Sequence, residues 1–141
     1  MRLFAFCLSS MRITQAIPDS LTEKAKSSLR LRAIMDLRNR PDDQSQRILN
    51  SIEPGSLISI HRPRHSSETV VCLRGRLVEE FYDDLDRMCT GAIELTPGGP
   101  VVALNIPASQ WHKVRALESG TVLLECKDGP YELLGKEDIL L

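Results

Sequence analysis

The sequence predicts an all-β domain preceded by one short helix, and three observations carry this prediction. Short runs rich in β-branched and aliphatic residues recur along the chain, as is typical of strands. Turn chemistry separates these runs, for example at Pro54-Gly55 and at Asp128-Gly129-Pro130. No helical pattern lies between them, which excludes parallel βαβ units and favours a sandwich or a barrel.

The helical pattern begins after Pro18. Ser20 and Glu23 have the spacing of a capping box, and apolar residues then recur at helical spacing up to Leu29. We expect this helix to end at residues 30–32. The expected strands are 46–53, 56–62, 68–73, 76–82, 90–95, 101–105, 112–117 and 120–127.

Length and charge predict one small domain. A chain of 141 residues is long enough to bury about two-thirds of its unfolded surface. We expect residues 1–17 to form a partly disordered N-terminal extension and residues 18–141 to form the domain. The net charge of −1 gives no electrostatic reason to expect nucleic acid or an anionic membrane as a partner.

The cysteines and the apolar runs indicate a cytoplasmic protein. The four cysteines are scattered without a C-x-x-C pair, and two lie in apolar runs, at Cys72 and Cys126. This pattern is typical of reduced, buried thiols. No stretch approaches the ~18 apolar residues of a membrane span. The apolar run 3–8 is shorter than the usual core of a signal peptide.

Three residues on two strand-like segments suggest a metal site. His61 and Glu68 flank one turn, and His112 lies on a later segment. Two imidazoles and one carboxylate form a donor set that holds non-haem Fe(II) and leaves coordination positions open. The alternative interpretation is that these are solvated loop histidines and a surface carboxylate. The framing residues favour the metal site, with the spacings Gly55-x5-His61, Glu68-x6-Gly75 and Pro107-x4-His112.

This spacing resembles the two-part signature of the cupins, G-x5-H-x-H-x(3,4)-E-x6-G followed by P-x-G-x-x-H. The segments QRILNSIEPG, SSETVVCLRG and LLECKDGPYELLG extend the likeness to a WbuC-type cupin-fold metalloprotein over residues 18–138. The resemblance implies that the β-structure is a double-stranded β-helix, or jelly roll. It also implies a divalent transition metal, such as Fe, Zn, Mn or Ni. Since cupins commonly dimerise through edge strands, a homodimer is a candidate assembly.

The chain departs from the cupin signature at two positions. Pro63 stands at the second histidine, and Ser109 stands where the family often has glycine. Carried over position by position, the resemblance assigns His61, Glu68 and His112 as ligands. His65, two residues beyond the vacant position, is a further candidate, although a turn in this segment would leave the direction of its side chain open.

Several polar residues are candidates for binding a substrate. Arg47 and Asn50 cannot both point inward from a regular strand, so we expect at most one of them in the cavity. Arg47 is the preferred contact for an anion, because a guanidinium forks onto carboxylate or phosphate. Glu125 and Lys127 alternate onto one face, and Tyr131 follows the next turn. The alternative for these three residues is surface charge on an edge strand.

Two functions stay open at this point. Members of the WbuC group are often encoded among genes for surface-polysaccharide or O-antigen synthesis, which implies a sugar or nucleotide-sugar ligand. A metal-dependent enzyme of the isomerase or epimerase kind would polarise a carbonyl or enediolate oxygen of that ligand. The other function is a non-catalytic sugar or small-molecule binding protein with a degenerate metal site, and the loss of the second histidine favours it.

Overall fold

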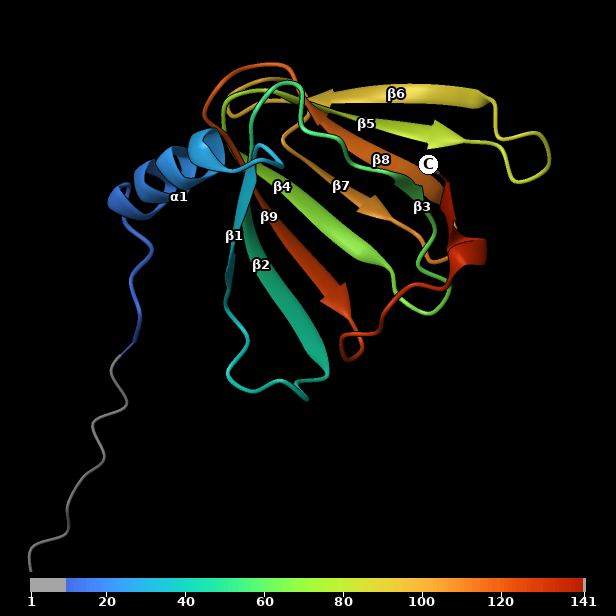
Figure 1. Cartoon of the computed structure of the whole chain (residues 1–141), viewed down its shortest axis with the longest axis horizontal. Coiled ribbons are helices and arrows are strands. Elements are labelled where there is room, and N and C mark those ends of the chain that lie inside the picture. The colour runs from blue at the N-terminus through green and yellow to red at the C-terminus, as the bar shows by residue number, and fades with distance from the viewer. Residues whose placement is uncertain (1–9, 141) are drawn as a thin grey trace, which may run out of the picture.

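Two antiparallel five-stranded sheets and one N-terminal helix make up the protein, for which a computed structural model describes residues 10–140. Residues 1–9 of the expected extension 1–17 lie outside the described residues, and residues 16 and 17 belong to the helix. In Figure 1 the strands of both sheets converge near the helix and fan apart at the other end. The prediction of an all-β fold with a short N-terminal helix is confirmed.

The first sheet has the strand order β1-β2-β9-β4-β7. Its strands are β1 (Arg32–Asp36), β2 (Ser45–Ile52), β9 (Thr121–Asp128), β4 (Glu68–Arg74) and β7 (Ala103–Ile106). The second sheet has the order β10-β3-β8-β5-β6. Its strands are β10 (Ile139–Leu140), β3 (Ile60–His61), β8 (Trp111–Ala116), β5 (Leu77–Tyr82) and β6 (Cys89–Leu95). A short 3-10 helix, Lys136–Asp138, precedes β10.

Helix α1 (Ala16–Ser27) differs from the prediction at both ends. It begins before Pro18, because a proline in the first helical turn sacrifices no intrahelical hydrogen bond. Ser20 therefore lies inside the helix, and the predicted capping box is wrong. The chain turns extended at Ser28, so Leu29 is fully exposed instead of packing on a helical face.

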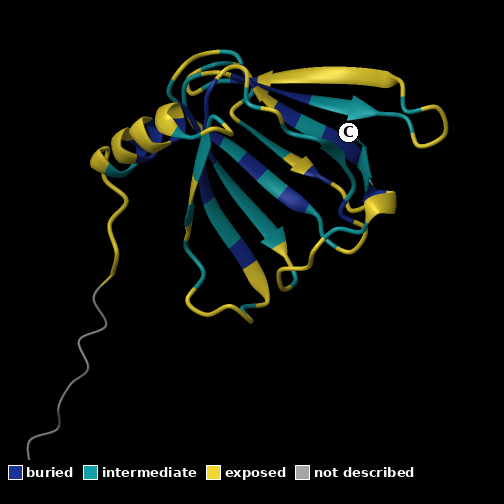
Figure 2. Ribbon diagram, in the orientation of Figure 1, coloured by how far each residue is buried: buried dark blue, intermediate teal, exposed yellow. Residues whose placement is uncertain are grey.

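The strand register determines which side chains face the space between the sheets. Alternate residues of a strand point to opposite faces, and directly paired residues point to the same face. Ile52, Val70 and Leu123 of the first sheet pack against Leu77 and Ala116 of the second. Figure 2 shows buried segments near the converging ends and also partway along the strands. The opposite end of the interior carries mostly polar residues.

The sequence missed two strands, β1 and β10. Strand β10 has only two residues, too few to display an alternating pattern. Strand β1 has three consecutive apolar residues between Arg32 and Asp36, so it too shows no alternation of apolar and polar residues. The expected strand 56–62 shrinks to β3, because 56–59 form no regular pairing.

Two expectations from composition have a structural counterpart. Cys72, Cys89 and Cys126 are free thiols, of which Cys72 is buried and Cys89 is exposed. Cys7 lies outside the described residues. Among residues 10–140, none of the helices has the length and apolar character needed to span a membrane.

Gly75 is required by its surroundings. Its φ is +77°, and a Cβ at this position would lie 2.8 Å from the Cα of Thr121. No side chain larger than hydrogen fits there without moving the backbone of Thr121, where β9 begins. This glycine of the sequence pattern therefore keeps β4 and β9 in close approach.

Ser109 has a positive φ like Gly75, but it is not a glycine. Its φ is +69°, in the left-handed region that favours glycine. We expect Ser109→Gly to raise the free energy of unfolding by about 0.5–1 kcal/mol, or about 2–4 °C in Tm. Ser109→Ala is the control, because it keeps the strain and removes only the hydroxyl bond to the Arg64 carbonyl. Equal Tm values for the glycine and alanine variants would contradict a strained Ser109.

Candidate metal centre

The two histidines are neighbours because their strands pair at this one position. His61 of β3 lies directly opposite His112 of β8, so both imidazoles point into the space between the sheets. Their ring centroids are 4.5 Å apart. Glu68 approaches from β4 of the facing sheet. One donor atom from each of the three residues lies within 4.8 Å of the others, so the structure brings the predicted ligand set together.

Backbone hydrogen bonds orient both imidazoles. The Nδ1 atoms of His61 and His112 lie 3.1 Å and 2.8 Å from the carbonyl oxygens of Ser59 and Gln110. A histidine that donates its Nδ1–H to a carbonyl presents Nε2 as a metal ligand, and such contacts fix the tautomer in known metal sites. In both cases the carbonyl oxygen that accepts the Nδ1–H hydrogen bond belongs to the residue two positions before the histidine.

The separation of the donors fits a metal ion. The His112 Nε2 atom lies 3.1 Å from Glu68 Oε1. Two ligands bound at about 2.1 Å to one ion, at about 90° to each other, are also about 3 Å apart. The hydrogen bond between these atoms is therefore one that an ion can replace, with release of the shared proton.

The charges of His61 and Glu68 suit a cation, whereas His112 must release a proton, because burial is outweighed by its hydrogen bond with Glu68 and the charge of that carboxylate, which raise the pKa of His112. Burial, followed by the nearby His112, lowers the pKa of His61 to about 4, so its imidazole is neutral at physiological pH. Burial alone would raise the pKa of Glu68, but its hydrogen bond with His112 and the charge of Lys127 outweigh it and lower the pKa to about 2. A neutral imidazole and an ionised carboxylate are the forms that bind metals.

Lys127 and Glu125 lie beside the donor set on the same inward face of β9. Lys127 pairs in register with Glu68, and its Nζ lies 3.2 Å from Glu68 Oε2 and 3.9 Å from Glu125 Oε2. Glu68 Oε2 is buried without a well-aligned hydrogen bond among the described residues, despite this short ion pair. Burial raises the pKa of Glu125. Both predicted residues therefore face the interior.

Asn50 also faces the interior, and Arg47 does not. Asn50 is buried opposite Leu123, and its Oδ1 accepts no hydrogen bond from the described residues. Arg47 points to the other face of β2, where its guanidinium bonds Asp43 at 3.1 Å and the hydroxyl of Ser45. It borders a small hollow of about 320 Å³ at the strand ends, but the structure does not bring its charge to the metal cluster.

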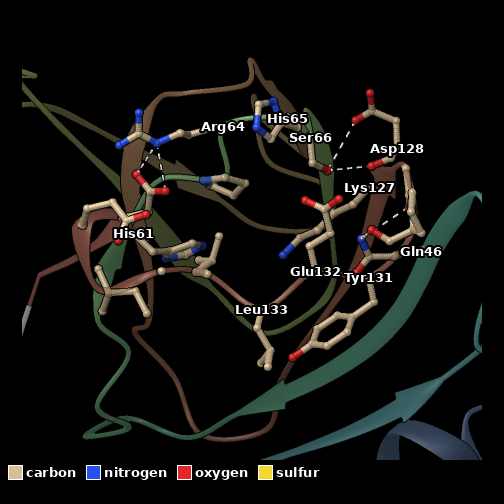
Figure 3. A pocket seen from close by; sticks show the side chains of 18 of the residues that line it. Gln46, His61, Arg64, His65, Ser66, Lys127, Asp128, Tyr131, Glu132 and Leu133 are labelled. Carbon is tan, nitrogen blue, oxygen red and sulfur yellow. Dashed lines mark hydrogen bonds and ion pairs between the residues drawn. The ribbon is translucent and has the colours of Figure 1, made fainter.

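A cavity of about 900 Å³ opens beside His61. Figure 3 shows His61 on one side of it and Gln46, Lys127 and Tyr131 on the other. Tyr131 is 56% exposed and lies under the guanidinium of Arg38. The lining comes from the strand ends and from the segment that leads to β10, namely Arg32, Gln46, His61, Pro63, Arg64, His65, Ser66, residues 127–135, Glu137, Asp138 and Ile139.

Pro63 and Ser109, the two residues that depart from the cupin signature, are hydrogen-bonded to each other. The backbone N–H of Ser109 donates to the carbonyl oxygen of Pro63 at 2.8 Å. Pro63 is buried and lines the cavity with His61, whereas His65 is exposed and lies outside the three-residue cluster. In the described structure, the cluster thus has no third imidazole.

Restoring the missing imidazole should strengthen metal binding. We expect Pro63→His to raise the affinity for Zn²⁺ or Ni²⁺ at least about tenfold, ~1.4 kcal/mol, because the new side chain replaces a ring on the same cavity wall as His61. Chelator competition at fixed pH measures the change. His65→Ala is the control and should alter affinity little. No gain from Pro63→His, together with a large loss from His65→Ala, would assign His65 as the third imidazole.

Sequence analysis missed one acidic residue of the interior. Glu79 is 1% exposed on β5, and its Oε2 has no hydrogen-bond partner among the described residues. Burial raises its pKa to about 8. The available signal was the alternation of Leu77, Glu79 and Phe81, which puts a carboxyl in phase with two apolar residues.

Comparisons with solved structures identify the fold. KdgF from Halomonas sp. superposes with a TM-score of 0.56 at 15% identity, over 71% of this chain and 82% of that one. A conserved protein of unknown function from Streptococcus pyogenes gives 0.56 at 16% identity, over 74% and 80%. A mutant of Bacillus subtilis oxalate decarboxylase OxdC gives 0.57 at 16% identity, over 78% of this chain and 28% of that one. At these identities the likeness shows the cupin fold alone.

Sequence comparisons show the family. No curated protein sequence matches the chain. A family model described as a domain of unknown function, DUF6016, matches residues 13–93. This match includes His61 and Glu68 and ends before His112. Because it spans more than half of the 141 residues, the chain is a cupin-fold protein that belongs to the DUF6016 family.

Proposed function

We propose that the protein binds one divalent transition metal, Fe, Zn, Mn or Ni, and uses it to hold a sugar or nucleotide-sugar intermediate. The observation that carries the proposal is the convergence of two imidazoles and one carboxylate from three strands at a largely buried position. A three-residue set leaves coordination positions free for an oxygen of the ligand. His61, which lines the cavity, is the member of the set next to that ligand.

The lining of the cavity supports a polyhydroxylated ligand. Gln46 provides an amide, Ser66 a hydroxyl, Lys127 an ammonium and Tyr131 an aromatic face. Each hydroxyl of a sugar can donate and accept hydrogen bonds, so a sugar site needs both kinds of partner. An aromatic ring can pack against the C–H groups of a sugar. The resemblance to WbuC-type cupins supports the same class and suggests a role in surface-polysaccharide synthesis.

The residues suit an isomerase-like or epimerase-like reaction. When bound, the ion would supply Lewis acidity toward a carbonyl or enediolate oxygen. Lys127 holds the second oxygen of Glu68 and so keeps that carboxylate ionised. Burial raises the pKa of Glu79 to about 8 and also raises that of Glu125. Glu79 therefore retains its proton near neutral pH, which makes it a candidate to donate a proton.

A non-catalytic binding protein is the second candidate function. Pro63 favours this second function, because it stands where the cupin signature has its second histidine, so the candidate metal site has one imidazole fewer. A metal-dependent turnover of a keto-sugar, or exchange of a carbon-bound proton followed by NMR in D₂O, would favour the enzyme. Binding without either would favour the binding protein.

Metal and ligand titrations test the proposal. Metal-free protein should take up one equivalent of Zn²⁺, Mn²⁺, Ni²⁺ or anaerobic Fe²⁺ in calorimetry. A panel of keto-sugars, sugar acids and nucleotide-sugars should then raise the Tm of the loaded protein only. Failure to bind any of these ions stoichiometrically would overturn the metal centre. Equal ligand binding by loaded and metal-free protein would overturn the role of the metal.

A further inference from the structure

A second cluster lies on the far side of the strands that carry the histidine ligands. It consists of Arg62, Asp84, Arg87, Trp111 and Asp138, and we name it the outer clamp; of these residues, Asp138 also borders the cavity. Arg62 directly follows His61, and Trp111 directly precedes His112. Because adjacent residues of an extended chain point in opposite directions, the neighbours of two inward histidines meet outside the cavity.

The contacts of the clamp join the two ligand-bearing segments. The guanidinium of Arg62 lies 4.6 Å from the centre of the Trp111 ring, and that of Arg87 lies 4.5 Å from it. Asp84 Oδ1 accepts hydrogen bonds from Trp111 Nε1 at 2.9 Å and from Arg62 Nη1 at 2.8 Å. A single carboxylate oxygen therefore connects the residue after one ligand to the residue before the other.

Asp138, near the C-terminus, binds the guanidinium of Arg62 as well. Its carboxylate accepts hydrogen bonds from Arg62 Nε and Nη2 at 3.1 and 3.0 Å, and from Arg64 Nε at 2.7 Å. Its carbonyl oxygen accepts the Arg62 backbone N–H at 2.9 Å. The Asp138 side chain is 8% exposed, so these charge-assisted bonds are shielded from water and strong.

The backbone alone holds His61 weakly. Strand β3 has two residues and pairs with β8 at one position, His61 opposite His112. On its other side it pairs with the two residues of β10. Such short ladders leave the distance between the two imidazoles to the side-chain contacts around them.

We propose that the outer clamp fixes the separation of the His61 and His112 imidazoles, with Asp84 and Asp138 as positioning residues of the metal centre. The inference rests on the proposed metal function for its effect on affinity. Its effect on the two imidazoles does not depend on a metal. Partners that orient metal ligands typically contribute 10–100-fold to affinity.

Asp84→Ala tests the clamp, with Asp19→Ala as the matched control. Asp84 and Asp19 have side chains that are 67% and 68% exposed, and each pairs with an arginine. In metal-free protein, we expect Asp84→Ala to shift the imidazole NMR signals of both histidines and Asp19→Ala to leave them in place. In loaded protein, Asp84→Ala should weaken Zn²⁺ binding at least about tenfold and change the visible spectrum of bound Co²⁺. Asp84→Asn, which keeps an acceptor for Trp111, should restore part of both.

The outcomes separate the clamp from the metal function. Unchanged imidazole signals, or unchanged Zn²⁺ affinity and Co²⁺ spectrum, in both Asp84→Ala and Asp138→Ala would overturn the clamp while the wild type still binds metal. A wild type that binds no metal would overturn the proposed function, and the imidazole signals would still decide the clamp. A merely structural role would lower the Tm of metal-free Asp84→Ala without moving the imidazole signals, and this result counts against the clamp.

Discussion

Replacing His112 with alanine should abolish stoichiometric metal binding. His112 is 2% exposed, and its Nε2 is one of three donor atoms in the cluster. Losing one donor of three should weaken binding at least about a hundredfold, ~2.7 kcal/mol. Metal analysis of the purified variant and chelator competition measure the effect. We expect the domain to stay folded, because the core cluster of apolar residues does not include His112.

His65→Ala is the matched control for this prediction. It removes an imidazole that is exposed and outside the cluster, so metal content should equal that of the wild type. Circular dichroism of both variants verifies the fold. Equal metal content in His112→Ala and the parent protein would rule out the centre described above.

Glu79→Gln should flatten the dependence of stability on pH in metal-free protein. Burial raises the pKa of Glu79 in the folded chain to about 8 from its ordinary value of 4.5. Between these values the folded state keeps the proton and the unfolded state releases it, so the free energy of unfolding falls as pH rises. About three pH units at ~1.4 kcal/mol each give up to about 4 kcal/mol between pH 5 and pH 8. The variant lacks this loss and should be the more stable protein at pH 8.

Urea unfolding at pH 5 and pH 8 with a chelator present measures this difference. Glu94→Gln on the neighbouring strand β6 is the control, since the Glu94 side chain is 49% exposed. Its pH dependence should follow the wild type. A Glu79→Gln variant that loses as much stability as the wild type over this range would contradict a buried, protonated Glu79.

The sequence predicted the ligand set because the donors and their framing residues follow a local pattern. The spacings of His61, Glu68 and His112 are visible in the sequence. The alternation of side chains along a strand then allows these residues to face the interior. Glu79 was missed because it lies beside Glu80. The phase of Glu79 with Leu77 and Phe81 is matched by the phase of Glu80 with Val78 and Tyr82, so the alternation does not single out the inward carboxyl. The direction of the Arg47 side chain was left open for a related reason, since a shift of one residue in register reverses the face.

Features that depend on distant segments were not predictable. The outer clamp joins four stretches, at residues 62, 84–87, 111 and 138, that no local pattern relates. The capping box at Ser20 and Glu23 was a local signal, but the helix begins earlier, at Ala16. Leu21 and Ala25 are buried in α1 whether the helix starts at Ala16 or after Pro18, so the core permits the earlier start.

The pairing of β3 with β10 sets the order in which the centre is assembled. His61 lies between β8 and Ile139, so its strand has no second neighbour until the ribosome has added the residues of β10. Contacts between positions so far apart form slowly, because a long loop must close first. The donors of the candidate centre thus come together only when segments from distant parts of the chain, the C-terminal β10 among them, have paired.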